Sequence, residues 1–350
     1  MDTQSVLHLL SVTPGPSGHE RAVADRIAEL FAPYCDEIRR DALGNVIAWK
    51  RGTGGGPKVM WAAHMDEIGL IVREVRPDGF LRVAPIGGMD ARNIVAQEVV
   101  VHGRRDLPGI IGTKPPHLLT ADQRDKVMPL HELFVDVGLD GTRAAELVRP
   151  GDVITLHREP LRLHGQRFSG KALDDRACVA AMWEGLKFLQ GLRHEADVYA
   201  VATVQEEVGL RGAVTATFGI QPDVGIAIDV TFGDQPGVKK DDAADLGGGP
   251  DITRGANIHP GVFALLKQTA EAHGIPHQVS VAPAQTGTDA WAIQVTQAGV
   301  PTGLLSVPLR YMHSTVETVD MRDIRETGRL LAHFTAACSA AAARGWSHGE

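Results

Sequence analysis

The sequence predicts an α/β protein in which a mixed-sheet α/β sandwich is interrupted by an inserted β-rich, barrel-like domain. After residue 170, apolar strands alternate with longer helical segments, which is the pattern of a layered α/β domain. Between residues 69 and 164, short β-rich runs are separated by Gly, Pro and Asp, a spacing typical of a small barrel or sandwich. We therefore expect residues 1–68 and 165–350 to form one discontinuous domain around an insertion at 69–164.

The first domain segment is expected to begin with a helix and to end with a buried strand. Ser17 precedes Glu20 by three residues, the spacing of a capping box, and the apolar residues of 23–31 follow at helical intervals. The Gly-rich stretch at 52–56 predicts a hairpin turn. The apolar run at 59–63 that comes after it predicts a buried strand.

Six short runs predict the strands of the insertion, namely GLIVREV, FLRVAPIG, QEVVVHG, GIIGT, ELFVDVG and DVITLH. Beyond them, the apolar residues of 176–192 recur on one side of a helix. Buried strands are predicted at VYAVATVQ, VGIAIDVT, HQVSVAP and PTGLLSVP, with a helix at VFALLKQTAEAHG. The alanine-rich segment 321–344 predicts one long final helix.

The composition is that of a soluble globular protein. Of the 350 residues, 43% are hydrophobic and 22% are charged, and the 35 basic and 43 acidic side chains give a net charge of −8. Because the chain is acidic and has no cluster of Lys and Arg, we expect no nucleic-acid partner. No apolar run approaches the ~18 residues that span a bilayer, so no membrane partner is expected either.

The cysteines and the N-terminus indicate a cytoplasmic protein. Cys35, Cys178 and Cys338 are scattered and odd in number, so neither a disulfide framework nor a thiolate metal motif is expected. The N-terminus has Asp2 close to its start and no basic region, which does not fit an export signal.

Metal-binding side chains stand at the ends of several predicted strands and helices. His64 and Asp66 are two residues apart, so on a strand they point to the same face, where the carboxylate could orient the imidazole; an ordinary buried histidine is the alternative. Asp174 and Asp175 stand just ahead of a predicted helix. They could simply cap it, or one could bind a metal while the other supports it.

Further acidic and imidazole groups follow three apolar strands. Glu206 and Glu207 end the run VYAVATVQ, and Asp229 interrupts VGIAIDVT near its end. His313 follows the predicted strand PTGLLSVP. Carboxyl ends of strands are where α/β sheets bind ligands, although a solvated charge pair or a helix cap could explain each residue alone. Together, imidazoles and carboxylates without thiolates suit Zn, Co or Mn, and one spare acid could act as the base of a two-metal hydrolase.

Nine motifs, taken in order, are similar to those of one known family: AAHMDEIGLIV, IGTKPPHLL, LFVDVG, GKALDDRACVAA, TVQEEVGLRGA, IAIDVT, GPDITRGANIHP, GTDAWAIQ and YMHSTVE. Over nearly its whole length the chain resembles the tetrahedral (TET) aminopeptidases. This family of dinuclear metallo-exopeptidases includes glutamyl and deblocking aminopeptidases and proteins once labelled endoglucanase. The resemblance implies a discontinuous metallopeptidase domain and an inserted domain that serves dimerisation.

The resemblance implies two divalent metal ions per subunit, Zn most readily, with Co or Mn also acceptable. His64 and Asp229 would bind one ion, Glu207 and His313 would bind the other, and Asp174 would bridge both.

The resemblance also implies catalytic roles. Glu206 would be the general acid and base, and Asp66 would orient His64. Asp289, in the motif GTDAWAIQ, could line the substrate site or merely cap the helix that follows it.

The expected function is that of an aminopeptidase that acts through a metal-bridging hydroxide on peptides with a free N-terminus. By the same resemblance, its dimers would assemble into a tetrahedral dodecamer. One alternative is a metal-independent endoglucanase-type glycoside hydrolase using Glu206 and Glu207, although neighbours on a strand point to opposite faces and are poorly placed to flank one bond. Another alternative is a non-catalytic assembly protein.

Overall fold

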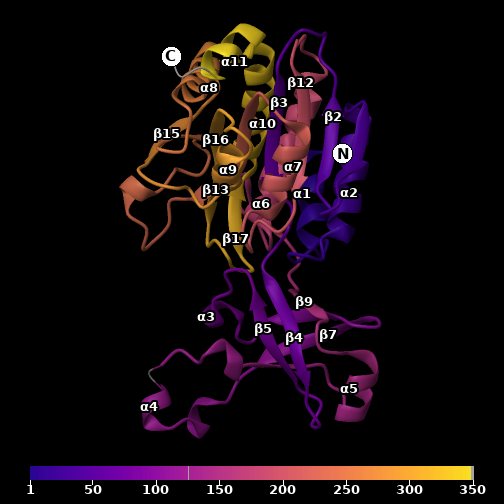
Figure 1. Cartoon of the computed structure of the whole chain (residues 1–350). Helices are drawn as coiled ribbons and strands as arrows, with labels where there is room; N and C mark the ends of the chain where they lie inside the picture. The colour runs from indigo at the N-terminus through magenta and orange to yellow at the C-terminus, as the bar shows by residue number, and fades with distance from the viewer. Residues whose placement is uncertain (125, 348–350) are drawn as a thin grey trace.

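The computed structural model describes residues 1–124 and 126–347 and has the predicted class, a mixed α/β domain that carries a closed barrel (Figure 1). An eleven-stranded sheet runs in the order β1-β2-β12-β3-β13-β16-β17-β11-β10, with β14 joined to β16 and β15 joined to β14. The strands are β1 (Glu37–Arg40), β2 (Val46–Lys50), β3 (Lys58–His64), β10 (Leu161–Arg162), β11 (Arg167–Gly170), β12 (Asp197–Thr203), β13 (Val224–Phe232), β14 (Asp251–Gly255), β15 (Gln278–Ala282), β16 (Thr302–Arg310) and β17 (Glu317–Asp320).

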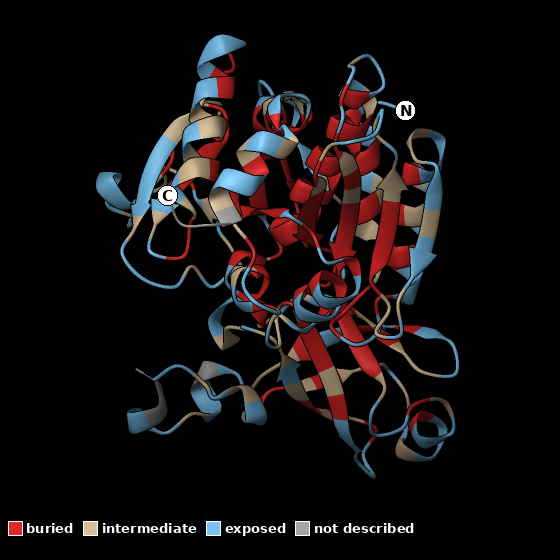
Figure 2. Cartoon of the chain, turned by 45° about the horizontal axis from the view of Figure 1, so that its top comes forward, coloured by how far each residue is buried: buried red, intermediate tan, exposed pale blue. Residues whose placement is uncertain are grey.

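The four central strands are parallel, and helices cover both of their faces. β12, β3, β13 and β16 run in one direction, so their carboxyl ends meet at a single edge of the sheet. Successive side chains of β3 point to opposite faces of the sheet. Trp61 packs in the apolar core on one face, and Met60 packs in the apolar core on the other. Figure 2 shows this buried centre between exposed outer helix faces.

The larger helical layer contains α1 (Thr3–Val12), α2 (Arg21–Phe31), α6 (Leu173–Leu189), α8 (Pro260–Ala272) and α10 (Met321–Ala337). The smaller layer contains α7 (Arg211–Ile220) and α9 (Asp289–Val295). Short 3-10 turns lie at Ala32–Tyr34 and Lys240–Asp242. In the described part of the chain, no helix has both the length and the hydropathy that a membrane crossing requires.

The inserted segment is a closed antiparallel barrel, as the short β-rich runs predict. Its strands follow the order β4-β5-β8-β7-β6-β9 around a separate apolar core. They are β4 (Gly69–Val75), β5 (Leu81–Ile86), β6 (Glu98–His102), β7 (Asp106–Gly112), β8 (Phe134–Asp136) and β9 (Val153–Leu156). The connections contain α3 (Ala91–Ile94), α4 (Ala121–Arg124), α5 (Gly141–Leu147) and 3-10 turns at Pro116–Leu118 and Leu130–Glu132.

The predicted hairpin at residues 52–56 is wrong. β2 and β3 are not paired, because β12 lies between them, antiparallel to β2 and parallel to β3. The Gly-rich stretch instead crosses the start of β12, where a Cβ at Gly52 would lie 2.2 Å from the carbonyl oxygen of Glu195. The glycines are therefore needed for a close backbone crossing rather than for a tight turn.

Three details of the helices also differ from the predictions. The helix α1 was not foreseen. No side chain caps α2, because the hydroxyl of Ser17 donates to Asp66 Oδ2 at 2.6 Å instead of capping the helix. The final helix is divided, since Cys338 has an extended backbone and a second helix, α11 (Ala340–Ser347), begins after Ser339.

The contact between α6 and α10 yields a stability prediction. A Cβ at Gly328 would lie 2.5 Å from the carbonyl oxygen of Ala181 and 2.8 Å from the backbone nitrogen of Gly185. We expect Gly328→Ala to lower the free energy of unfolding by about 1–3 kcal/mol, measured by urea denaturation, because the two backbones must separate. The matched control is Gly219→Ala in α7, where the space is open and alanine should be neutral or stabilising. Equal stability of the two variants would contradict this packing.

Candidate metal centre

The parallel strands bring the predicted residues to one edge of the sheet. His64 is the last residue of β3, and Asp229 lies in β13, the next strand. Glu206 and Glu207 lie just beyond the end of β12, on the other side of β3. Because these strands are parallel, their carboxyl ends meet, and this is the edge at which α/β sheets hold ligands.

Asp174 lies between the two imidazoles. Its Oδ1 is 3.1 Å from His64 Nε2, and its Oδ2 is 3.3 Å from His313 Nε2. The residue stands in the first turn of α6, where the backbone of Asp174 and Asp175 departs from helical geometry. Although burial opposes it, hydrogen bonds with His313 and His64 hold the pKa of Asp174 below its usual value. The carboxylate therefore presents one oxygen to each imidazole.

Two groups of potential ligand atoms share His64. In one group, atoms of His64, Asp174 and Glu207 all lie within 4.8 Å of one another, and His313 Nε2 is 3.6 Å from Glu207 Oε1. In the other, atoms of His64, Asp175 and Asp229 lie within the same distance. The five predicted ligands are thus brought together. Asp175 joins them, with its Oδ2 accepting a hydrogen bond from the backbone of His64 at 3.1 Å.

Glu206 lies beside the same imidazole but is not held by it. Its Oε2 is 3.9 Å from His64 Nε2, beyond hydrogen-bond distance. Burial, together with nearby carboxylates such as Asp229, raises the pKa of Glu206 to about 10. Burial likewise raises the pKa of Glu207 to about 7, and the charge of Asp174 adds to this effect. The centre therefore concentrates carboxyl groups in a dry environment that disfavours their charged forms.

Asp66 is fully buried below these acids and connects three segments. Its carboxylate accepts hydrogen bonds from the backbone N–H groups of Glu206 at 3.0 Å and Glu207 at 3.2 Å, and from Ser17. His64 Nδ1 is 3.3 Å from the carbonyl oxygen of Asp66 and 3.5 Å from its Oδ1. Asp66 is thus placed to orient the ring, and it also fixes the turn that carries both glutamates.

Asp289 is the first residue of α9 and is buried. Its Oδ2 accepts a hydrogen bond from the hydroxyl of Thr203 at 2.6 Å, and its Oδ1 has no partner among the described residues. Thr203 pairs with His64 in the sheet, so Asp289 lies close to the centre. The helix is capped by Thr288 rather than by Asp289, which removes the capping role considered for Asp289.

Sequence reasoning missed Glu317, a buried carboxylate that holds the two segments carrying the predicted ligands Asp174 and His313. Its Oε2 accepts hydrogen bonds from the backbone N–H groups of Leu173 at 2.7 Å and Asp174 at 3.1 Å. Its Oε1 accepts from the N–H of His313 at 2.9 Å. The signal was present in YMHSTVE, where the acid follows the histidine by four residues, but only the fold brings it to Asp174.

A buried ion cluster below the centre was also missed. Glu67 lies 2.6 Å from Lys171 Nζ and 3.2 Å from Arg176 Nη2, and all three side chains are buried. Arg176 also donates to the carbonyl oxygens of Met65 and Leu10. The cluster joins the end of β3, the start of α6 and the N-terminal segment, the same elements that carry His64 and Asp174.

The side chains present fit divalent metal ions. Five acids of the centre, all of them mostly buried, face only two imidazoles, and among the described residues no Lys or Arg pairs with them: Asp174, Asp175, Glu206, Glu207 and Asp229. Asp175 Oδ1 is buried without a hydrogen-bond partner in the described part of the chain. Uncompensated buried carboxylates are costly, and bound divalent cations would compensate them. Oxygen and imidazole ligands without thiolate suit Zn, Co or Mn.

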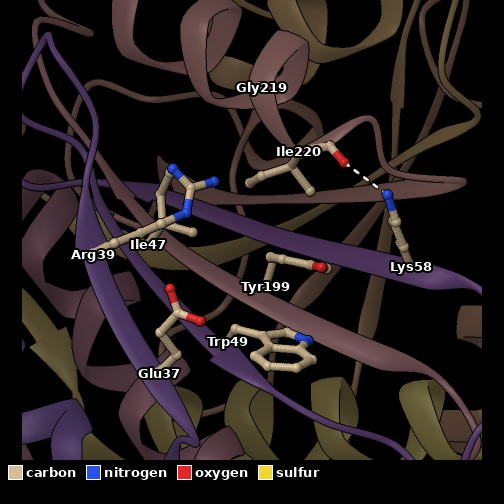
Figure 3. A pocket seen from close by; sticks show the side chains of 8 residues that line it. All are labelled: Glu37, Arg39, Ile47, Trp49, Lys58, Tyr199, Gly219 and Ile220. Carbon is tan, nitrogen blue, oxygen red and sulfur yellow. Dashed lines mark hydrogen bonds between the residues drawn. The ribbon is translucent and has the colours of Figure 1, made fainter.

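A second polar pocket lies far from this centre. It has a volume of about 270 Å³, and Figure 3 shows Arg39, Trp49, Lys58 and Tyr199 among its lining residues. Lys58 is the first residue of β3, whereas His64 is the last, so the two sites lie ~20 Å apart along the strand. This pocket contains none of the predicted site residues.

The chain is similar to several known proteins over most of its length. Residues 44–330 match the M42 glutamyl aminopeptidase family. A lysyl aminopeptidase from Pyrococcus furiosus is 43% identical over 324 residues, which cover 91% of this chain and 92% of the relative. An aminopeptidase from the archaeon Desulfurococcus kamchatkensis superposes with a TM-score of 0.91 at 41% identity, over 98% of this chain and 97% of that chain.

A further similar structure is of a peptidase that forms a large assembly. The TET1 peptidase of Pyrococcus horikoshii, described as able to form a tetrahedron or a large octahedral shell, superposes with a TM-score of 0.85 at 32% identity. The similarity covers 95% of this chain and 99% of that chain, so it includes both the α/β domain and the barrel.

Proposed function

The chain belongs to the M42 glutamyl aminopeptidase family and is a peptide-bond hydrolase, and we propose that it removes N-terminal residues from peptides with two divalent metal ions. The observation that carries the proposal is the position of Asp174, which offers one carboxylate oxygen to each of His64 and His313. A carboxylate in this position suits two neighbouring cations.

In this proposal, His64 and Asp229 hold one ion and Glu207 and His313 hold the other, with Asp174 shared. The grouping of His64 with Asp229 and the 3.6 Å approach of His313 Nε2 to Glu207 Oε1 support this division, and the grouping of His64 with Asp174 and Glu207 indicates that the two ions would be neighbours. We assign Asp175 a supporting role, because its Oδ2 is engaged by the backbone N–H of His64. Zinc fits the ligand set, and cobalt or manganese would also be accepted.

Bound ions would supply positive charge that acidifies a water molecule and stabilises negative charge developing on the scissile carbonyl oxygen. Glu206 takes a proton from the attacking water and returns it to the leaving amine. Its pKa of about 10 would fall toward neutrality beside cations, into the range that suits proton transfer at neutral pH. Asp66 keeps Glu206 in place through the hydrogen bond to its backbone N–H.

Asp289 contributes to the substrate side of the site. Its Oδ1 lacks a partner within the described residues, and its carboxyl lies near Glu206 and His64. A free carboxylate oxygen in this position would suit the α-amine of a peptide N-terminus. The substrates in this proposal are therefore peptides with a free N-terminus.

Membership of a peptidase family disfavours both alternatives considered from the sequence, the glycoside hydrolase and the non-catalytic assembly protein. The structure adds an argument against the first. Glu207 approaches His313, and Glu206 approaches His64, so both acids belong to the proposed metal centre rather than to a metal-free pair that flanks one sugar bond.

Replacement of the proposed base gives a direct test. We expect Glu206→Gln to keep its bound metal, measured by elemental analysis, while turnover of aminoacyl substrates falls by about 10²-fold or more. Glutamine keeps the size of the side chain but cannot carry the proton. The matched control is Glu184→Gln, a buried glutamate of α6 that contacts Thr3 and Lys187 and should leave activity unchanged. Near-full activity of Glu206→Gln would show that the base is another residue.

Metal removal tests the remainder of the proposal. Treatment with EDTA should abolish cleavage of aminoacyl chromogenic substrates, and addition of Zn, Co or Mn should restore it. A panel of such substrates, run with each metal, also identifies the preferred N-terminal residue. Hydrolysis that persists after complete chelation, with no transition metal found by elemental analysis, would exclude the dinuclear mechanism.

We also propose that the inserted domain at 69–164 serves dimerisation and that dimers build a tetrahedral dodecamer in the cytoplasm. An apolar groove on the barrel supports a contact there, since Val99, Pro108, Gly109 and half-exposed Ile110 line about 640 Å³ of space. Mass photometry should detect particles many times heavier than the 37.5 kDa chain. A stable monomer at working concentration would contradict this assembly.

A further inference from the structure

His313 is held in place from two different domains. It lies in the loop between β16 and β17, has a φ of 61°, and keeps a third of its side chain exposed. Its backbone N–H donates to Glu317 in the α/β domain. Its ring Nδ1 is 3.1 Å from the carbonyl oxygen of Gly88, which follows β5 of the barrel. The inserted domain therefore contacts one ring nitrogen of His313, Nδ1, while acids of the α/β domain face the other.

The contact with Gly88 determines which ring nitrogen of His313 has a lone pair available to bind a metal ion. A carbonyl oxygen can only accept a hydrogen bond, so His313 Nδ1 must carry the hydrogen. The lone pair of the neutral ring is then on Nε2, the atom that faces Asp174 Oδ2 at 3.3 Å and Glu207 Oε1 at 3.6 Å. A partner on the second ring nitrogen fixes both the tautomer and the direction of a metal-binding imidazole.

Two adjacent glycines allow the barrel to approach this closely. A Cβ at Gly88 would lie 2.8 Å from His313 Nδ1 and 2.9 Å from its Cε1. A Cβ at Gly87 would lie 3.3 Å from the Cβ of Glu207, and the φ of Gly87 is +75°, a conformation that favours glycine. The barrel backbone therefore contacts both residues proposed to hold one of the two ions.

His64 differs from His313 in this respect. Its side chain is 2% exposed, and its Nδ1 faces the carbonyl oxygen of Asp66, only two residues away in the same domain. No described barrel residue forms a hydrogen bond with its ring. A displacement of the barrel would thus release the ring of His313 and leave that of His64 in place.

We infer that the barrel loop at 86–89 is part of the metal centre, with the Gly88 carbonyl as a positioning group that sets the affinity of the ion at His313 and Glu207. The ion at His64 and Asp229 is insensitive to this loop. This inference rests on the proposed two-metal function. Occupancy of the ion site at His313 and Glu207 would then depend on the position of the barrel relative to the α/β domain. Any contact that shifts the barrel would change this occupancy.

Calorimetric titration of the metal-free full-length protein with Zn²⁺ tests the inference. Wild type should bind two ions, and His313→Ala identifies which of the two binding steps belongs to the site at His313. In Gly88→Ala the added methyl displaces the ring, so this step should weaken by about 10–100-fold while the other step is unchanged. Gly88 is exposed and its φ does not lie in the left-handed region, so the variant should fold normally.

The matched control is Gln97→Ala. Gln97 belongs to the barrel and accepts a 3.3 Å hydrogen bond from Thr315 of the α/β domain, whereas the hydrogen bonds of His313 go to Glu317 and Gly88. This variant should bind both ions with wild-type affinity. Wild-type binding of both ions by Gly88→Ala, or equal weakening of both steps, would overturn the inference and leave the two-metal proposal intact. Binding of fewer than two ions by wild type would overturn both.

Discussion

The carboxylates gathered at the carboxyl edge of the parallel strands impose the main physical constraint on this protein. Asp174, Asp175, Glu206, Glu207 and Asp229 are largely removed from water, and within the described residues only two imidazoles face them. Burial disfavours the charged form of these acids and raises the pKa of Glu206 to about 10, and repulsion from neighbouring carboxylates adds to this effect. A fold that keeps these acids together needs opposing charge at the centre and a rigid scaffold around it.

The scaffold is built from hydrogen bonds between segments distant in sequence. Asp66 accepts from the backbone of Glu206 and Glu207, and Glu317 accepts from the backbone of Asp174 and His313. In each case one buried carboxylate fixes the backbone of two residues of the candidate centre. The cluster of Glu67 with Lys171 and Arg176 supports the strand and helix beneath them.

The two domains share the site unequally. The α/β domain supplies all the charged side chains of the centre, whereas the barrel supplies backbone through Gly87 and Gly88. A backbone carbonyl and two glycines cannot be recognised in the sequence as parts of a site. They nevertheless determine how closely the barrel approaches His313.

The sequence by itself determined the class of fold and the identity of the acids and imidazoles, because the periodicity of apolar residues is local and strand ends can be located from it. It predicted the barrel runs, the strands that carry His64 and Asp229, and the pair Glu206–Glu207. Only the tertiary structure decided which strands are neighbours: β12 separates β2 from β3, so the expected hairpin does not form. The tertiary structure also decided that Ser17 donates a hydrogen bond to Asp66 and does not cap α2, and that Glu317 and Gly88 lie at the centre. Contacts between residues distant in sequence depend on packing and leave no local sequence pattern.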